Sequence, residues 1–259
     1  MRRPPLRRLA AGRPRRRIRA DGKRRRRKLF WGCLALLGFV VCGFLAYRLT
    51  HPGAVLTGAP GLTEIPAYAG EDTVVLNGNL PSFTEDELTR ECFVRFSPLD
   101  GRGRTGAAEA CLGLETLPTR PRAGIDASIR PSGWHSVRYD DLIEDGFLYN
   151  RCHLIGYLLC GDDATRENLF TGTRRLNHEL MLPYEKQVAD CIAETGMHVL
   201  YRVTPHYRGG DALAFGVEME ACSVEDVGRE LCFHVFVYNV QPGIEIDYAT
   251  GASRRGRGE

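Results

Sequence analysis

The sequence predicts an α+β fold, an antiparallel sheet carrying a few helices, preceded by one N-terminal transmembrane helix. The C-terminal third holds apolar or alternating stretches separated by turn residues, as expected of strands, at 198–204, 212–222 and 231–240. Residues 183–195 predict a helix, because Pro183 suits a first helical turn and Gly196 stands where a helix stops. An uncharged run of nineteen residues, 29–47, predicts the transmembrane helix.

Weaker signals place the other elements. TVVLNGNL, residues 73–80, predicts a strand that stops at an Asn-Gly turn. Thr84 with Glu87 three residues later predicts a capped helix start. Trp134 is expected to fill core space. Residues 147–159 indicate a strand, a histidine-bearing turn and an apolar continuation.

The N-terminal segments predict a membrane topology. Residues 1–28 hold fifteen Arg or Lys and one acid, which favours a disordered basic arm. As a helix, the run 29–47 would be ~28 Å long at ~1.5 Å per residue, close to the thickness of a bilayer core. That length favours an uncleaved membrane anchor formed by residues 29–49. The alternative is a long signal sequence, whose cleavage would release the protein from the cell. The charge asymmetry predicts a single-pass protein of the cell membrane with a cytoplasmic N-terminus and an extracellular domain.

Other interpretations of the basic arm and of the uncharged run account for fewer of these features. A buried core helix would be expected to show a polar face, and it would leave the one-sided charge unexplained. The arm could bind nucleic acid, but topology and anionic lipid already account for it. Residues 50–64 are rich in Pro, Gly, Ala and Thr and predict a linker, followed by one domain at 65–253 and a frayed tail at 254–259.

The composition of the chain after Leu49, the predicted extracellular part, argues against several functions. After Leu49 there are 19 basic and 31 acidic residues, a net charge near −12, which argues against coating nucleic acid by bulk charge. Seven of the nine cysteines lie there, so up to three disulfides are expected in an exported domain, although their pairing is not readable. No C-x-x-C spacing occurs, and a structural zinc site is not expected. The glycine-rich stretch 101–113 lacks the G-x-x-x-x-G-K-[ST] order of a nucleotide loop.

One region gathers residues suited to phosphodiester chemistry. Between His153 and Glu185 the chain offers an imidazole, arginines, asparagines and a carboxylate near a helix start. A histidine can deprotonate water, and a hard divalent cation can stabilise charge on phosphate oxygens. Asparagine is a neutral oxygen ligand for such an ion. A histidine beside apolar residues is more often a core side chain, so these residues alone leave the function open.

The stretch NRCHLIGYLLCGDDATRENLFTGTRRLNHELMLPYE, residues 150–185, resembles the signature of the DNA/RNA non-specific endonucleases, the ββα-metal or His-Me finger nucleases. The likeness is greatest to their streptodornase-like branch of secreted DNases and DNA-entry nucleases. It extends over roughly residues 65–253 through LDGRGRTGAAEACLG, RPSGW, VLYRVTPHYRGGDALAFGVEMEACS and YNVQPGIEIDYATG.

The resemblance implies a role for each matching residue. His153 would be the general base, and Asn177 the protein ligand of one Mg²⁺, for which Mn²⁺ can substitute. Glu185 would partner metal-bound water, and Arg151 would act with these catalytic residues as a phosphate contact. Asn168 would hold the metal-bearing turn against the histidine strand, and it is grouped with the substrate-binding residues.

Arginines are the other substrate-binding candidates, because an acidic domain needs a local basic groove to hold a polyanion. Arg174 and Arg130 are the first choices. For each arginine the alternative is a surface ion pair, and this also holds for Arg120, Arg122, Arg138, Arg166 and Arg175. His178, beside Asn177, is the one further histidine worth testing.

Two positions depart from the family pattern. Asn150 stands where the family has an aspartate, as in the streptodornase branch. Cys152 stands where it has a glycine, so a bulkier side chain, or a disulfide, would lie next to the base.

The implied function is metal-dependent, non-specific hydrolysis of DNA, with RNA as a further candidate, and no protein partner is predicted. Neutral His153 would take a proton from the attacking water, and Mg²⁺ on Asn177 would stabilise the phosphate and the leaving oxygen, giving 5′-phosphate ends. The alternative is a catalytically weak, membrane-anchored DNA-binding receptor for DNA uptake. A toxin-like effector ranks last, because no delivery module is visible.

Overall fold

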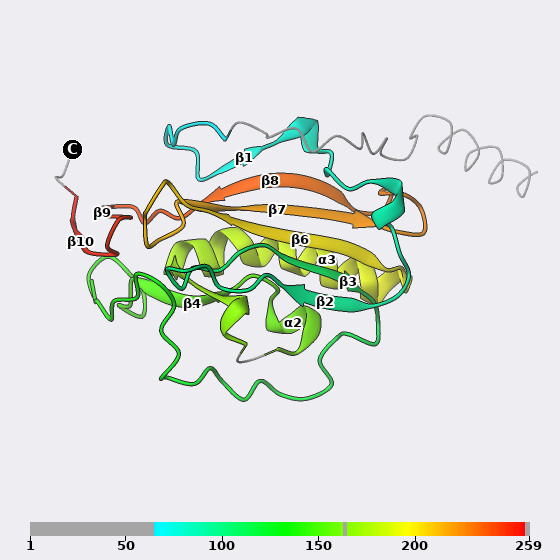
Figure 1. The fold of residues 1–259 in the computed structure, drawn as a ribbon, viewed down its shortest axis with the longest axis horizontal. Coiled ribbons are helices and arrows are strands. Elements are labelled where there is room, and N and C mark those ends of the chain that lie inside the picture. Colours follow the sequence, from blue (N-terminus) through cyan, green and yellow to red (C-terminus); the bar gives the residue numbers. More distant parts are fainter. Residues whose placement is uncertain (1–64, 163–164, 257–259) are drawn as a thin grey trace, which may run out of the picture. The chain divides into compact units, whose positions relative to one another are not determined.

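The computed structural model describes residues 65–162 and 165–256 (Figure 1). The basic arm, the anchor and the linker predicted at residues 1–64 lie outside this part of the chain. Within it, no helix has the length and apolar character needed to cross a membrane.

A six-stranded antiparallel sheet forms the centre of the domain. Its strands are, in spatial order, β1 (Thr73–Val75), β8 (Cys232–Tyr238), β7 (Gly216–Ser223), β6 (Val199–His206), β3 (Ala108–Leu112) and β2 (Phe93–Phe96). The three strands predicted in the C-terminal third are confirmed as neighbours. Strands β2 and β3 were not predicted as strands, and the glycine-rich stretch supplies both the turn between them and β3 itself. The predicted α+β class is therefore confirmed.

The predicted helix is α3 (Leu182–Thr195), which lies along one face of the large sheet (Figure 1). It ends at Gly196, whose φ of 70° is the left-handed conformation that favours glycine and whose N–H donates to the Ile192 carbonyl. Val188 and Ile192 are fully buried in one core cluster with inward-facing sheet residues such as Met219. Burial of each such side chain contributes about 1.5–3 kcal/mol, so packing against the sheet fixes this helix.

A smaller two-stranded sheet lies before α3 in the chain. β4 (Tyr149–His153) pairs antiparallel with β5 (Leu169–Thr173), so that His153 is opposite Leu169. The elements around these strands are α2 (Tyr157–Cys160), the 3₁₀ turn η3 (Arg166–Asn168) and the π-helical turn η4 (Leu176–Met181). The order β4, β5, α3 is a ββα unit.

Two local expectations are wrong. Arg254 and Arg255, predicted in a frayed tail, join Ser253 in β10 (Ser253–Arg255), which pairs with β9 (Ile244–Ile246). The helix predicted to start at Thr84 is one 3₁₀ turn, η2 (Glu85–Glu87), comparable to η1 (Asn77–Asn79). The capping contact does form, since the Thr84 N–H donates to Glu87 at 2.6 Å. Leu88 then turns extended and packs against the sheet, which ends the turn.

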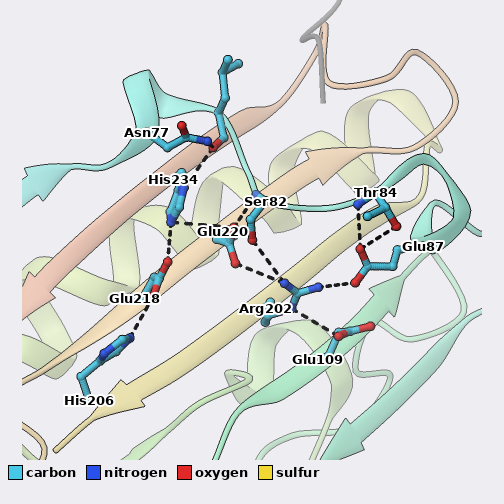
Figure 2. Close-up of polar contacts among 11 residues, drawn as sticks. Asn77, Ser82, Thr84, Glu87, Glu109, Arg202, His206, Glu218, Glu220 and His234 are labelled. Atoms are coloured by element: carbon cyan, nitrogen blue, oxygen red, sulfur yellow. Dashed lines mark hydrogen bonds and ion pairs between the residues drawn. The ribbon is translucent and has the colours of Figure 1, made fainter. Parts of the chain in front are cut away.

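The sheet face opposite α3 carries a polar network (Figure 2). Arg202 on β6 reaches three carboxylates, those of Glu87 at 2.6 Å, Glu109 at 3.3 Å and Glu220 at 3.5 Å. Glu220 is 3% exposed and also accepts the Ser82 N–H. The network fixes the segment that contains η2 over the sheet.

Candidate active site

His153, the last residue of β4, is 7% exposed. Strand alternation places Arg151 and His153 on one face and Cys152 on the other, where it joins the core cluster. The His153 Nδ1 lies 3.4 Å from a terminal nitrogen of Arg122. A guanidinium can only donate, so this contact selects the neutral imidazole with a lone pair on Nδ1.

Asn177 lies in the π-helical turn that leads into α3. The start of this turn is fixed by Thr173, whose hydroxyl accepts the Leu176 N–H at 3.0 Å and donates to the Val240 carbonyl at 2.8 Å. Single π-helical turns are frequent at functional sites because they re-aim side chains within a helix. Asn177 is half-buried there.

Glu185, on α3, is the buried carboxyl group of the region, with 7% of the residue exposed. Burial raises its pKa to about 7, although the Arg122 charge and a backbone hydrogen bond from Gly156 act in the lowering direction. An added Cβ on Gly156 would lie 2.5 Å from a Glu185 oxygen. The carboxyl group is therefore held closely against the turn that follows His153.

One cavity of about 270 Å³ joins these residues. It is lined by four of the sequence-predicted residues, His153, Asn177, Glu185 and Arg151. A neighbouring cavity of about 520 Å³ shares Asn177 and Arg151 and adds Arg130. The structure thus brings the predicted base, metal ligand and carboxylate together, and it places Arg130 on the adjoining surface.

Asn168 braces the turn after His153. It is fully buried, its Oδ1 accepts the N–H groups of Leu154 at 3.1 Å and Ile155 at 2.8 Å, and its amide nitrogen donates to the Ile155 carbonyl. This position fits the bracing role and not the substrate contact with which Asn168 was grouped.

Arg174 lines neither cavity. It pairs with Asp145 at 2.9 Å and donates to Nε2 of His178 at 2.8 Å. Its structural effect is to hold the His178 ring at the edge of both cavities, which His178 lines.

Arg151 holds part of the cavity wall. Its guanidinium donates to the backbone carbonyls of Ile129, at 2.5 Å, and Ala127, at 3.1 Å, and stacks over Trp134 with 4.3 Å to the ring centre. Trp134, expected only to fill core space, therefore lies beside the candidate site.

Arg122 is the residue that the sequence did not single out. It was one of several arginines of equal weight, yet it contacts His153 and lines both cavities. It lies in a long irregular segment between β3 and β4, where no periodicity relates its position to that of His153. Linear spacing carried no signal that could have selected it.

No disulfide occurs among the described residues, and all seven of their cysteines are free thiols. Cys152, at the family's glycine position, is accommodated by Gly172 on β5, where an added Cβ would lie 2.5 Å from the Cys152 Sγ. The extra volume on one strand is thus matched by a missing side chain on the other.

A ββα unit with histidine, asparagine and glutamate around one cavity is the arrangement that the resemblance to the ββα-metal nucleases implies. A sequence model of the DNA/RNA non-specific endonuclease matches residues 86–225. The chain belongs to this family, which confirms the resemblance seen in the sequence.

Solved structures agree with this assignment. NucA from Streptococcus agalactiae with magnesium ion bound is 28% identical, with a TM-score of 0.62 over 70% of this chain and 86% of that chain. The same nuclease with no metal bound gives 28% identity and 0.60 over the same shares. Sda1 nuclease with bound zinc ion is 25% identical, with a TM-score of 0.52 over 63% of this chain and 82% of that chain. These streptococcal nucleases match the streptodornase-like branch.

Proposed function

We propose that this family member is a metal-dependent endonuclease that hydrolyses phosphodiester bonds of DNA, and of RNA as a further substrate, with His153 as general base. The observation that supports it is the single cavity lined by His153, Asn177 and Glu185. Nuclease activity itself follows from the family, and the residue roles are the proposal.

In this proposal neutral His153 takes the proton of the attacking water at Nδ1, and the long 3.4 Å contact with Arg122 gives way to that water. Arg122, beside that nitrogen, and Arg151, in the same cavity, neutralise charge on the phosphate as the transition state forms. Asn168 keeps the imidazole in position by fixing the backbone immediately after it.

The donor set fits a hard divalent cation. Asn177 offers a neutral amide oxygen and Glu185 a buried carboxyl, both facing one cavity, and oxygen donors of this kind suit Mg²⁺ or Mn²⁺. A bound ion would supply Lewis-acid stabilisation of the phosphate and of the leaving oxygen. The magnesium-bound NucA and the zinc-bound Sda1 support the divalent class without selecting among metals.

We also propose that the domain lies outside the cell, attached by residues 29–49, with residues 1–28 cytoplasmic. It rests on the uncharged run and the one-sided positive charge of the sequence. In intact cells, added protease should remove a C-terminal tag and spare an N-terminal one. Recovery of the chain in the medium, shortened at its N-terminus, would indicate cleavage and secretion instead.

Plasmid digestion tests the catalytic proposal. Full-length protein in detergent should nick and linearise plasmid with Mg²⁺ or Mn²⁺ and stop with EDTA. His153→Ala should lower the rate by about 10²–10⁴-fold, the usual contribution of a positioned base. Asn177→Ala should raise the metal concentration required.

The matched control is His135→Ala, since His135 is exposed and lines neither cavity. Intact plasmid after hours with wild-type protein and Mg²⁺, combined with retained DNA binding, would favour the receptor alternative. A His153→Ala rate equal to that of the control would exclude His153 as the base.

A further inference from the structure

A second cluster of metal-binding side chains lies at one end of the large sheet. Cys92 precedes β2, Glu115 follows β3 and His198 precedes β6, and these strand ends are neighbours because the strands pair antiparallel in the order β6-β3-β2. One ligand atom from each residue lies within 4.8 Å of the others. None of the three lines a cavity of the candidate active site.

Gly113 makes this convergence possible. A Cβ at this position would lie 2.7 Å from a Glu115 carboxylate oxygen, 3.0 Å from the Cys92 Sγ and 3.0 Å from the His198 Cδ2. The three side chains therefore meet in the space that the glycine leaves.

The imidazole of His198 is oriented toward the cluster. Its Nδ1 lies 2.6 Å from Glu225 Oε1, and the other Glu225 oxygen accepts the His198 backbone N–H at 2.8 Å. With Nδ1–H donated to the carboxylate, the Nε2 lone pair points at the cluster, 4.0 Å from Glu115. A carboxylate that fixes the outer nitrogen of a histidine is the usual partner of a metal-ligating imidazole.

A second sulfur stands beside the first. The thiol of Cys111 lies near that of Cys92 and donates to the Thr89 carbonyl at 3.0 Å. Cys111 lies on β3, directly opposite Phe93 in the register. Two sulfurs, an imidazole nitrogen and a carboxylate oxygen are a donor set for four-coordinate zinc.

We infer that Cys92, Glu115 and His198 form a Zn²⁺ site, with the Cys111 sulfur as a fourth donor once it leaves the Thr89 carbonyl. Ligand bonds of ~2.0–2.3 Å place tetrahedral donors roughly 3.3–3.8 Å apart, so the longest separation in the present arrangement must contract by no more than about 1 Å. Exposed Glu115 can supply that movement. Binding replaces the proton of each ligating thiol, which is released to solvent.

The other cluster of metal-ligand type among the described residues is Glu218, Glu220 and His234. There both ring nitrogens of His234 already have partners, the Leu80 carbonyl and Glu218. The Arg202 guanidinium lies beside Glu220 and supplies positive charge. That group is an ion-pair network. In the part of the chain described, by contrast, no hydrogen bond is seen at the Nε2 of His198, and the Glu115 carboxylate lies 4.0 Å from it.

Cobalt titration tests the inference, because thiolate-bound Co²⁺ absorbs in the near ultraviolet and no cysteine lines the cavities of the candidate active site. Full-length, metal-free protein should show this band at one Co²⁺ per chain, and Zn²⁺ should displace it. Asn177→Ala should keep the band and Cys92→Ala should lose it. The matched control is Cys232→Ala, another half-buried thiol, which should keep it.

Competition with a chelator gives a second measurement, on a variant that keeps all the proposed zinc ligands. Glu225→Gln should weaken Zn²⁺ binding by about 10–100-fold, as expected for a residue that orients a ligating histidine. Circular dichroism and the thermal midpoint without metal establish that each variant is folded. Absence of the cobalt band in wild-type protein, its survival in folded Cys92→Ala, or unchanged zinc affinity in Glu225→Gln would each overturn the inference.

Discussion

The carboxyl group of Glu185 on α3 lies directly against Gly156, three residues after His153, so that an added Cβ would meet three of its atoms at 2.5–2.8 Å. This contact sets the distance between the helix and the turn, and with it the width of the cavity. A side chain at residue 156 would therefore disturb the site without removing any functional group.

Gly156→Ala should destabilise the protein by about 1–3 kcal/mol, the usual cost of overpacking, and should lower plasmid cleavage by at least about 10-fold through misplacement of Glu185. Urea unfolding and the plasmid assay measure the two effects. Gly101→Ala is the control, because nothing lies within 4 Å of its added Cβ. Equal behaviour of the two variants would contradict the contact.

Cys152 should be inert in catalysis although it is adjacent to His153. Its side chain is fully buried on the opposite face of β4, and burial raises the pKa of its thiol. Cys152→Ala should cost about 1 kcal/mol of stability and change the cleavage rate by no more than a few fold. A loss comparable to that of His153→Ala would mean that the thiol takes part in the chemistry.

Arg202 should be the most costly charge to remove from the large sheet. Arg202→Met leaves Glu220, 3% exposed, without its guanidinium partner, and breaking a buried pair in this way costs about 3–5 kcal/mol. Arg254→Met, in an exposed pair with Glu245, should cost less than about 1 kcal/mol. The denaturant midpoints of the two variants measure these losses of stability. Similar midpoints would show that the Arg202 network contributes little to the stability of the protein.

The Glu218 and His234 pair should give stability a defined pH window. Burial alone would raise the pKa of Glu218, but hydrogen bonds from His206 and His234 lower it to about 2. Burial likewise opposes the charge on His234, yet the Glu218 hydrogen bond leaves its pKa raised above 6.5. The carboxylate contribution is present above pH 4.5 and lost as pH falls toward 2, and the imidazolium contribution is present below pH 6.5 and lost as pH rises through the raised pKa.

Glu218→Gln should therefore be least stable, relative to wild type, between about pH 4.5 and 6.5, and the difference should shrink as pH falls toward 2 or rises through the raised pKa of His234. Urea midpoints collected within this window and on both sides of it measure the difference. A constant difference at all pH values would assign the loss to packing and not to charge.

The sequence predicted the elements whose signals are local. Pro183 and Gly196 mark α3 to within one residue, and the alternation along β6, β7 and β8 marks three neighbouring strands. His153, Asn177 and Glu185 were selected by the resemblance of residues 150–185 to a known nuclease motif, and they come together because they lie in one short ββα unit.

The features that depend on contacts between residues far apart in the sequence were not predicted. Strand β3 was hidden in a glycine-rich stretch, and its pairing with β2 and β6 is what makes it a strand. Arg122 reaches His153 from an irregular segment. The cluster of Cys92, Glu115 and His198 has no linear spacing that suggests zinc, since only the sheet register brings these residues together.

The β4–β5–α3 unit and the irregular segment before it contribute different parts of the two cavities. The ββα unit carries the proposed base and metal ligand, whereas the segment containing Arg122, Arg130 and Trp134 forms a wall of the neighbouring cavity. An exchange at Arg130 or Trp134, which line the neighbouring cavity and not that of His153, would alter the charge or width of that cavity and leave His153 and Glu185 in place. We expect such exchanges to change how tightly a nucleic-acid strand is held more than how fast it is cut.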